Sequence, residues 1–190
     1  MKNFYLKIFV IFLSIIVLSG CTAKSKNTIS NGEQFNNILM NYFIEKDTNQ
    51  LPLLINFISS KKMLEKQKNT KAPLMGFFAG IYHENEDLFE QLEEMKLSNS
   101  ALSLLSSSKE FEEIAEDMLS HKDYVLESPK ALDSFWGYFF ATGRDDVIQK
   151  LCYTSENSGD TIVKGAAKWS LDSNRKQFPD KIKKCSDYTK

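Results

Sequence analysis

The sequence predicts an all-α domain of about eight short helices in antiparallel pairs, arranged as a helical repeat. Only eight glycines and four prolines occur in 190 residues, and so few turn residues favour helices over a many-turned β fold. Apolar side chains recur at the spacing i, i+3, i+4, i+7, which places them on one face of a helix. One such pattern occurs twice in the chain, as in stacked helical hairpins.

Helices in the first half are predicted from apolar stripes and from prolines that fit a first helical turn. One runs over 33–45, and a second begins near Pro52. A third starts at Pro73 and leads into a short acidic helix. Two more are expected at 99–107 and 109–120, with Ser108 as the cap between them. The side chains expected to face inward from the third helix and the acidic segment are Leu74, Phe77, Phe78, Ile81, Tyr82, Leu88, Phe89, Leu92 and Met95.

In the second half the strongest helix signal runs from Ser128, a capping residue followed by a first-turn proline, to Gly143. Asp145 and Asp146 begin a short helix, and a helix over 160–172 follows. Asn174 is a candidate left-handed residue at the end of that helix. The side chains expected in the core are Leu132, Phe135, Trp136, Phe139, Phe140, Val147, Ile148, Leu151, Ile162, Val163, Ala166, Ala167, Trp169, Ser170 and Leu171.

The two aromatic helices are related by a shift of 58 residues, which maps Leu74 onto Leu132 and Phe77 onto Phe135. The acidic segment maps onto the helix after Gly143 at a shift of 59. Each half is therefore predicted to contain a long aromatic helix, an acidic turn, a short helix and a further helical pair. Two unrelated amphipathic helices with the same obligatory spacing are the alternative.

The first 20 residues have the three parts of a secretion signal. Lys2 and Lys7 are basic, and 8–18 is an apolar run too short to span a bilayer, which takes ~20 residues. The segment Leu18-Ser19-Gly20-Cys21 resembles the lipobox of bacterial lipoproteins. The resemblance implies cleavage before Cys21, a diacylglyceryl thioether on its sulfur and acylation of the new amine. An ordinary signal peptide with a chance cysteine is the alternative.

Several acyl chains anchor a protein firmly, because each buried methylene contributes ~0.8 kcal/mol. We therefore expect 1–20 to be a signal peptide, 21–34 a polar tether reaching up to ~40 Å from the membrane, and 35–190 the helical domain. The expected location is the bacterial cell envelope. Thr22 stands where an inner-membrane retention signal usually has Asp. This favours the outer membrane, facing the periplasm, in a cell with two membranes.

The charge of the chain argues against nucleic acid as a partner. The full chain has 24 basic and 25 acidic residues, and removal of the leader takes away Lys2 and Lys7, which leaves 22 against 25, a net charge of −3. Five lysines cluster between the second and third helices. They fit either a patch for anionic lipid headgroups or, as the favoured interpretation, a solvated helix end. These lysines are Lys61, Lys62, Lys66, Lys68 and Lys71.

Two cysteines remain beside Cys21. Cys152 lies in a short helix, and Cys185 ends a last helix that Pro179 is expected to open. In an oxidising compartment they allow one disulfide; two buried or unpaired thiols are the equal alternative. Neither belongs to a Cys-x-x-Cys pair, so a redox motif and a zinc knuckle are not expected.

No segment carries a catalytic or metal-binding motif. The densest set of candidate metal ligands is 83–87, His-Glu-Asn-Glu-Asp, which is better explained as a solvated acidic turn because His121 is the only other histidine. A Cys/His nucleophile has no electropositive setting in the sequence. Arg144, beside two aspartates, fits an ordered loop, a partner contact or a local ion pair. We expect no enzyme, no metal and no cofactor.

Three segments resemble those of a family of uncharacterised small bacterial proteins that are exported or lipid-anchored and helical. They are Gly-Phe-Phe-Ala-Gly at 76–80, Trp-Gly-Tyr-Phe-Phe-Ala-Thr-Gly at 136–143 and Ala-Lys-Trp-Ser-Leu-Asp-Ser-Asn at 167–174. The resemblance spans 73–185. It implies a helical fold and export, and it carries over no catalytic or binding residues.

Two functions are compatible with these features. The first is a non-enzymatic scaffold that is held at the membrane by its lipid and uses a helical-repeat surface to bind another envelope protein or peptide. The alternative is a carrier or sensor of a small apolar ligand between the aromatic helices. An enclosed pocket lined by Phe77, Phe78, Phe139 and Phe140 would favour the carrier, and a filled core would count against it.

Overall fold

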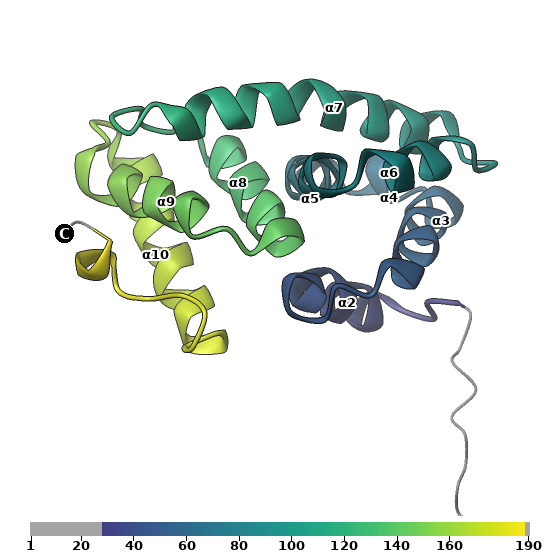
Figure 1. Cartoon of the computed structure of the whole chain (residues 1–190), viewed down its shortest axis with the longest axis horizontal. Helices are drawn as coiled ribbons and strands as arrows, with labels where there is room; N and C mark the ends of the chain where they lie inside the picture. Colours follow the sequence, from purple (N-terminus) through teal and green to yellow (C-terminus); the bar gives the residue numbers. More distant parts are fainter. Residues whose placement is uncertain (1–27, 189–190) are drawn as a thin grey trace, which may run out of the picture.

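The computed structural model describes residues 28–188 and is built from helices (Figure 1). In this range it has nine α-helices, three short 3-10 turns and no strand, which confirms the all-α prediction. The α-helices are α2 (Gly32–Glu45), α3 (Leu51–Lys61), α4 (Met63–Lys66), α5 (Lys71–Glu84), α6 (Glu86–Glu93), α7 (Asn99–Ser120), α8 (Pro129–Thr142), α9 (Asp145–Asn157) and α10 (Thr161–Gln177), and the 3-10 turns are η1 (Thr48–Gln50), η2 (Lys68–Thr70) and η3 (Cys185–Asp187).

The helical domain begins earlier than predicted. Ile29, assigned to the tether from the sequence, is buried in the core. Asn31 then caps α2, because its side chain accepts a hydrogen bond from the backbone N–H of Gln34. The end of the predicted tether, 21–34, thus belongs to the helical domain, while Cys21 lies outside the described residues.

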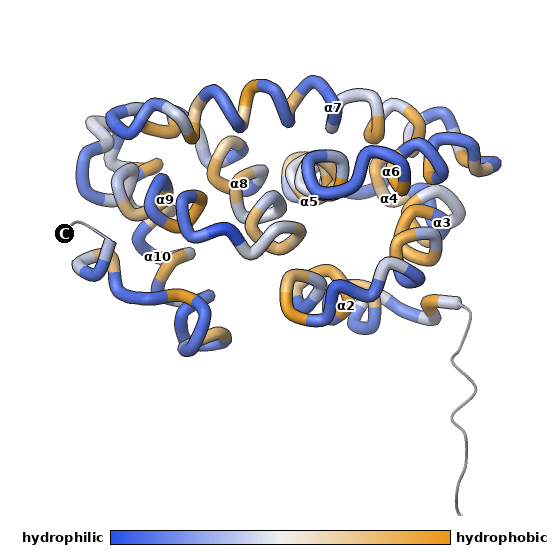
Figure 2. Tube along the Cα trace, in the orientation of Figure 1, coloured by the Kyte–Doolittle hydropathy of each residue, from blue (hydrophilic) through white to orange (hydrophobic). Residues whose placement is uncertain are grey.

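The predicted break at Ser108 is wrong, because α7 is one continuous helix of 22 residues. The Ser108 side chain is fully buried, and its hydroxyl donates to the carbonyl oxygen of Leu104, one turn earlier. This is the bond of a serine inside a helix rather than of a cap. Figure 2 shows hydrophobic and hydrophilic residues alternating along α7, as expected for a helix that packs on one side.

The C-terminal region differs most from the prediction. The helix expected from Pro179 is absent; η3 is the one helical turn in the described chain after α10, while Phe178 and Ile182 are buried. The α10 helix runs on to Gln177, so Asn174 lies within it and is not left-handed. Its side chain donates to the carbonyl oxygen of Ser170.

Two predicted core residues of α10 are exposed. Ile162 is 71% exposed and Trp169 is 73% exposed, whereas Trp136 on α8 is buried as predicted. The face of α10 that packs is made by Val163, Ala167 and Leu171.

The internal repeat extends over three consecutive helices. Helices α5 and α8 both have 14 residues, and their first and last residues differ by the same 58 positions. The starts of α6 and α9 differ by 59 positions, and those of α7 and α10 by 62. Each repeat therefore holds one long third helix, where the sequence had suggested a pair.

The equivalent helices α5 and α8 pack with their backbones in contact. A Cβ on Gly76 would lie 1.8 Å from the carbonyl oxygen of Ser134, and one on Gly137 would lie 1.9 Å from the carbonyl oxygen of Pro73. Gly80, one turn farther along α5, lies beside Ala141 of α8. The absence of side chains at these glycines permits this close approach.

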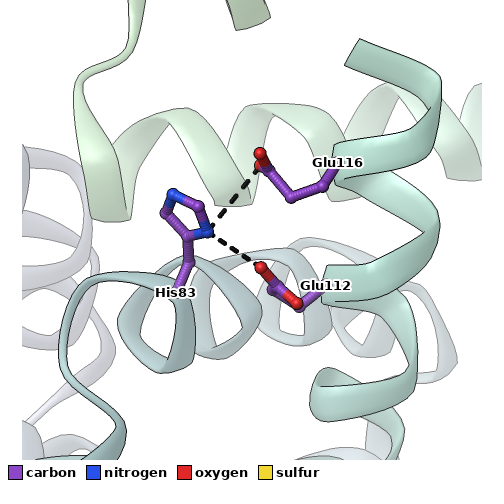
Figure 3. Close-up of side chains that lie close together, drawn as sticks. All are labelled: His83, Glu112 and Glu116. Atoms are coloured by element: carbon purple, nitrogen blue, oxygen red, sulfur yellow. Dashed lines mark hydrogen bonds and ion pairs between the residues drawn. The ribbon is translucent and has the colours of Figure 1, made fainter. Parts of the chain in front are cut away.

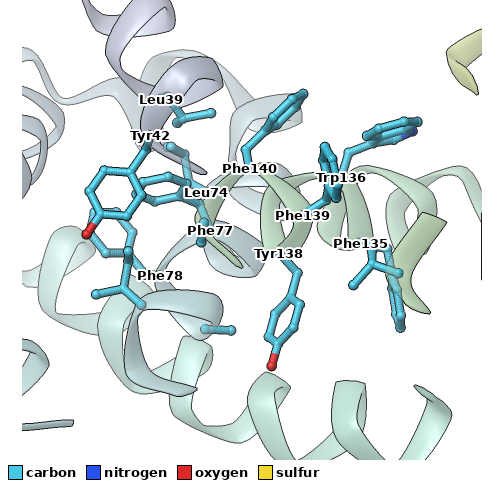
Figure 4. Close-up of a cluster of buried hydrophobic side chains, with 14 of the residues drawn as sticks. Leu39, Tyr42, Leu74, Phe77, Phe78, Phe135, Trp136, Tyr138, Phe139 and Phe140 are labelled. Carbon is cyan, nitrogen blue, oxygen red and sulfur yellow. The ribbon is translucent and has the colours of Figure 1, made fainter. Parts of the chain in front are cut away.

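An aromatic cluster fills the space around this crossing (Figure 4). Phe77, Phe78 and Phe139 are at most 1% exposed and Phe140 is 7% exposed. Ring pairs such as Phe77–Phe78 and Phe139–Phe140 meet edge to face at 5.5 and 5.8 Å. The space that the carrier hypothesis requires is thus occupied by the protein's own side chains.

Ionisation of Tyr42 of α2 is expected to lower the stability of the domain at alkaline pH. Its ring packs against Phe77, and burial, followed by the charges of Glu84 and Asp47, raises its pKa from 10.0 to about 12. Because the unfolded chain releases this proton first, the stabilising effect is complete below pH 10 and is lost as the pH rises to about 12. We expect the stability difference between the wild type and Tyr42→Phe to be constant below pH 10 and to shift in favour of the variant above it. Thermal unfolding from pH 8 to 12 measures this, and parallel curves would contradict it.

Candidate functional site

A polar cluster joins the two repeats beside the aromatic core. It brings together His83 from α5, Glu112 and Glu116 from α7, and Arg144 from the turn between α8 and α9. The glutamates are four residues apart, so both face the end of α5 (Figure 3). Sequence reasoning had noted His83 and Arg144 separately and had missed the two glutamates.

His83 bonds through both ring nitrogens. Nδ1 lies 2.8 Å from Glu112 Oε1 and 3.9 Å from Glu116 Oε1, while Nε2 lies 3.0 Å from Arg144 Nη1. A guanidinium only donates hydrogen bonds. Nε2 therefore accepts from Arg144, and the ring proton is assigned to Nδ1, where it is donated to Glu112.

Arg144 is the centre of the cluster. Its Nη2 and Nε bind the two carboxylate oxygens of Asp146 at 2.6 and 3.1 Å, and Nη1 binds Glu116 Oε1 at 2.5 Å. Burial lowers the pKa of Arg144, but the hydrogen bonds to Asp146 and Glu116 outweigh it and the net shift is upward. Such bidentate pairs are geometrically specific as well as strong.

Tyr138 of α8 completes the cluster. Its hydroxyl donates to Glu116 Oε1 at 2.6 Å, and the side chain points away from Phe139 and Phe140 of the same helix (Figure 4). Burial, then the bond to Glu116, raises the pKa of this phenol above its ordinary value. Glu116 Oε1 thus receives hydrogen bonds from Tyr138 and Arg144.

The cluster contains residue types that bind metals, but its side chains already bond to one another and to Arg144. Ligand atoms of His83, Glu112 and Glu116 lie within 4.8 Å of one another. The Arg144 guanidinium, however, already neutralises Glu116 and donates to His83. A divalent cation would have to displace it and would meet its positive charge. The arrangement suits the joining of α5, α7 and the α8–α9 turn.

Apart from His83, three side chains of the acidic segment 83–87 make hydrogen bonds that hold or begin helices. Glu84 pairs with Lys46, whose amine also donates to the carbonyl oxygens that end α8. Asn85 caps α6, and Glu86 accepts from Tyr82. His121 bonds within its own helix end, to Asp117 and Ser120. The two histidines therefore do not share a site.

A half-open groove of about 550 Å³ lies where α5 and α8 begin. Met75, Ala72, Phe111 and Ala131 form part of its apolar lining, and Lys130 is among the polar residues around it. The other lining residues are Asn69, Lys71, Pro129, Asp133 and Ser134. Partial burial raises the pKa of the Asp133 carboxyl. The volume is in the range of small-molecule and peptide side-chain sites.

The two cysteines of the domain are joined by a disulfide, with Cα atoms 5.4 Å apart. Of the alternatives that the sequence left open, the structure has the bridge. It ties η3 to α9. Because a disulfide-bonded sulfur is no thiolate, Cys152 is not a nucleophile in this state.

Comparison with known proteins finds no matching family model, no similar curated protein and no similar solved structure. The resemblance of the aromatic segments to exported bacterial proteins therefore stays a prediction. Within residues 28–188, no helix combines the length and hydrophobicity needed to cross a membrane.

Proposed function

We propose that the chain is a non-enzymatic binding protein of the bacterial cell envelope, held at the membrane by a lipid on Cys21. The support for the location is the leader and the Leu-Ser-Gly-Cys segment before the domain. A disulfide in the domain suits the same oxidising compartment. The outer membrane, facing the periplasm, is the proposed site in a cell with two membranes.

The groove at the start of α5 and α8 is the proposed binding site, and it is the observation that carries the proposal. Its lining includes Met75, a flexible side chain, and Phe111, an aromatic one, which suit the apolar anchor of a partner. Asn69, Lys71, Lys130 and Asp133 surround it with polar groups that fit the backbone and polar side chains of a peptide. The partner is a segment of another envelope protein with an apolar anchor.

A photo-cross-linking amino acid in place of Lys130, used in intact cells, tests this proposal. We expect it to capture one envelope protein, while the same amino acid in place of Asn37, an exposed residue of α2, does not. Ala131→Trp fills the groove and is expected to abolish the capture without loss of helix content. Equal products from positions 130 and 37, or capture unaffected by Ala131→Trp, would refute binding in the groove.

The size of the groove also favours a second candidate function, the transport or sensing of a small apolar ligand. The filled aromatic core excludes the site between Phe77 and Phe139, so the ligand would occupy the groove instead. Native mass spectrometry distinguishes the two functions. A bound small molecule in the wild type that is missing from Ala131→Trp would support the carrier, and the mass of the bare chain in both would count against it.

A further inference from the structure

The two most exposed large apolar side chains of residues 28–188 lie on one helix. They are Ile162 and Trp169 of α10, at 71% and 73% exposure. They are seven residues apart, which is close to two helical turns, so both lie on one face. The opposite face packs into the domain through Val163, Ala167 and Leu171. The α10 helix therefore has a second apolar face that no other described part of the chain covers.

Comparison of the two repeats indicates that this face is not required by the fold. The offset of 62 between α7 and α10 maps buried Ala101 onto Val163 and buried Leu105 onto Ala167. The same offset places Ser100 and Ser107 of α7 at the positions of Ile162 and Trp169. These two buried positions are thus shared by both helices, whereas the two outward positions carry serines in α7 and large apolar side chains in α10.

The C-terminal segment that contains this face is basic. Residues 161–188 have seven lysine and arginine side chains against three aspartates, a net charge of +4, whereas the whole chain has a net charge of −1. Lys176 lies a further seven residues beyond Trp169 and continues the same line. Among the described residues neither Lys168 nor Lys176 has an ion-pair partner, while Asp172 is paired with Arg175.

We propose that α10 docks on an anionic membrane surface, with Ile162 and Trp169 among the lipid headgroups and Lys168 and Lys176 beside the phosphates. Tryptophan is favoured at membrane–water interfaces, and helices with an apolar face and lysines lie in the interface plane. The inference rests on the proposed function in one respect: the lipid on Cys21 keeps the membrane within reach of the domain. Figure 1 shows α10 at the opposite end of the molecule from α3 and α4, where the other lysine cluster lies.

Vesicle binding by the oxidised chain from residue 21 onward, with Cys21→Ser so that no lipid contributes, tests this inference. Trp136 is buried, so a change in tryptophan emission reports on Trp169. We expect emission to move to shorter wavelength with vesicles that contain phosphatidylglycerol and to stay unchanged with phosphatidylcholine alone. Added salt reverses the shift, because it screens the attraction of the lysines to the surface.

Matched variants test whether vesicle binding depends on the α10 face or on exposed apolar and basic residues in general. In co-sedimentation, we expect Ile162→Ser with Trp169→Ser to weaken binding at least tenfold, and Leu102→Ser with Ile114→Ser, exposed residues of α7, to leave it unchanged. Lys168→Gln and Lys176→Gln each weaken it roughly fivefold. The control for charge is Lys61→Gln with Lys62→Gln, in the other lysine cluster, which should leave vesicle binding unchanged.

Failure of the chain to bind anionic vesicles, or equal binding by the α10 and α7 variants, would overturn the inference. A protein cross-link that depends on Trp169 without vesicle binding would also overturn it and identify α10 as a protein interface. These outcomes are independent of the cross-link from position 130, because vesicle binding is measured without the lipid anchor or a partner. Failure of the groove proposal and failure of membrane docking are therefore distinguishable.

Discussion

Substitution of a single glycine, Gly76→Ala, is expected to destabilise the domain by about 3 kcal/mol or more. The added Cβ would lie 1.8 Å from the backbone carbonyl oxygen of Ser134. No side-chain rotation relieves such an overlap, so α5 and α8 must separate and the aromatic rings on both helices lose their contacts. Gly137→Ala makes the equivalent overlap from α8 and is expected to have a similar effect. Urea unfolding followed by circular dichroism gives both values.

The matched control is Gly165→Ala. Gly165 also lies inside a helix, but an added Cβ there would meet no heavy atom within 4 Å. Because glycine weakens a helix interior relative to alanine, this variant is expected to be more stable by ~1 kcal/mol. If Gly76→Ala were as stable as Gly165→Ala, the close contact of α5 and α8 would be refuted.

Reduction of the disulfide is expected to lower the free energy of unfolding by about 3–4 kcal/mol. The bridge closes a loop between residues that are 33 positions apart, and in the chain-entropy model a loop of this length stabilises by that amount. Urea unfolding with and without dithiothreitol measures the effect. Cys152→Ser with Cys185→Ser should unfold at the lower midpoint and show no response to the reductant.

The loss should begin at the C-terminal segment. Phe178 and Ile182 are buried there, but this stretch has only turns and η3, with Cys185 at its far end. Limited trypsin digestion should therefore cut at Lys181, Lys183 or Lys184 in the reduced protein before it cuts α5 or α8. Equal midpoints in both redox states, or no preference for these sites, would show that the bridge does not hold this segment.

Much of the fold could be predicted because the signals that begin and end a helix lie in the residues next to its ends. Ser128, the following proline and Gly143 set the ends of α8, where Ser128 caps Ala131 and Gly143 takes a left-handed conformation. The repeat was visible because α5 and α8 must both present an aromatic face at the same spacing. The break predicted at Ser108 was wrong, since a serine hydroxyl can either cap a helix or bond to the preceding turn inside one.

The outward face of α10 and the polar cluster depend on tertiary contacts. Apolar residues at 162, 163, 166, 167 and 169 cover more than one face, so periodicity alone does not show which of them pack. His83, Glu116 and Arg144 meet only because α5, α7 and the α8–α9 turn converge. Glu112 and Glu116 were missed because a pair of glutamates four residues apart on a helix is a common pattern, and nothing in the sequence indicates their partner.

The proposed location at the membrane, and the access of α10 to the membrane surface, depend on the lipid on Cys21. Mass spectrometry of the N-terminal peptide from protein extracted from bacterial membranes is the most direct test. The account predicts that the chain begins at Cys21 and carries the added mass of a diacylglyceryl group, with no such peptide from Cys21→Ala. A chain that still begins at Met1, or one cut elsewhere with an unmodified Cys21, would contradict it.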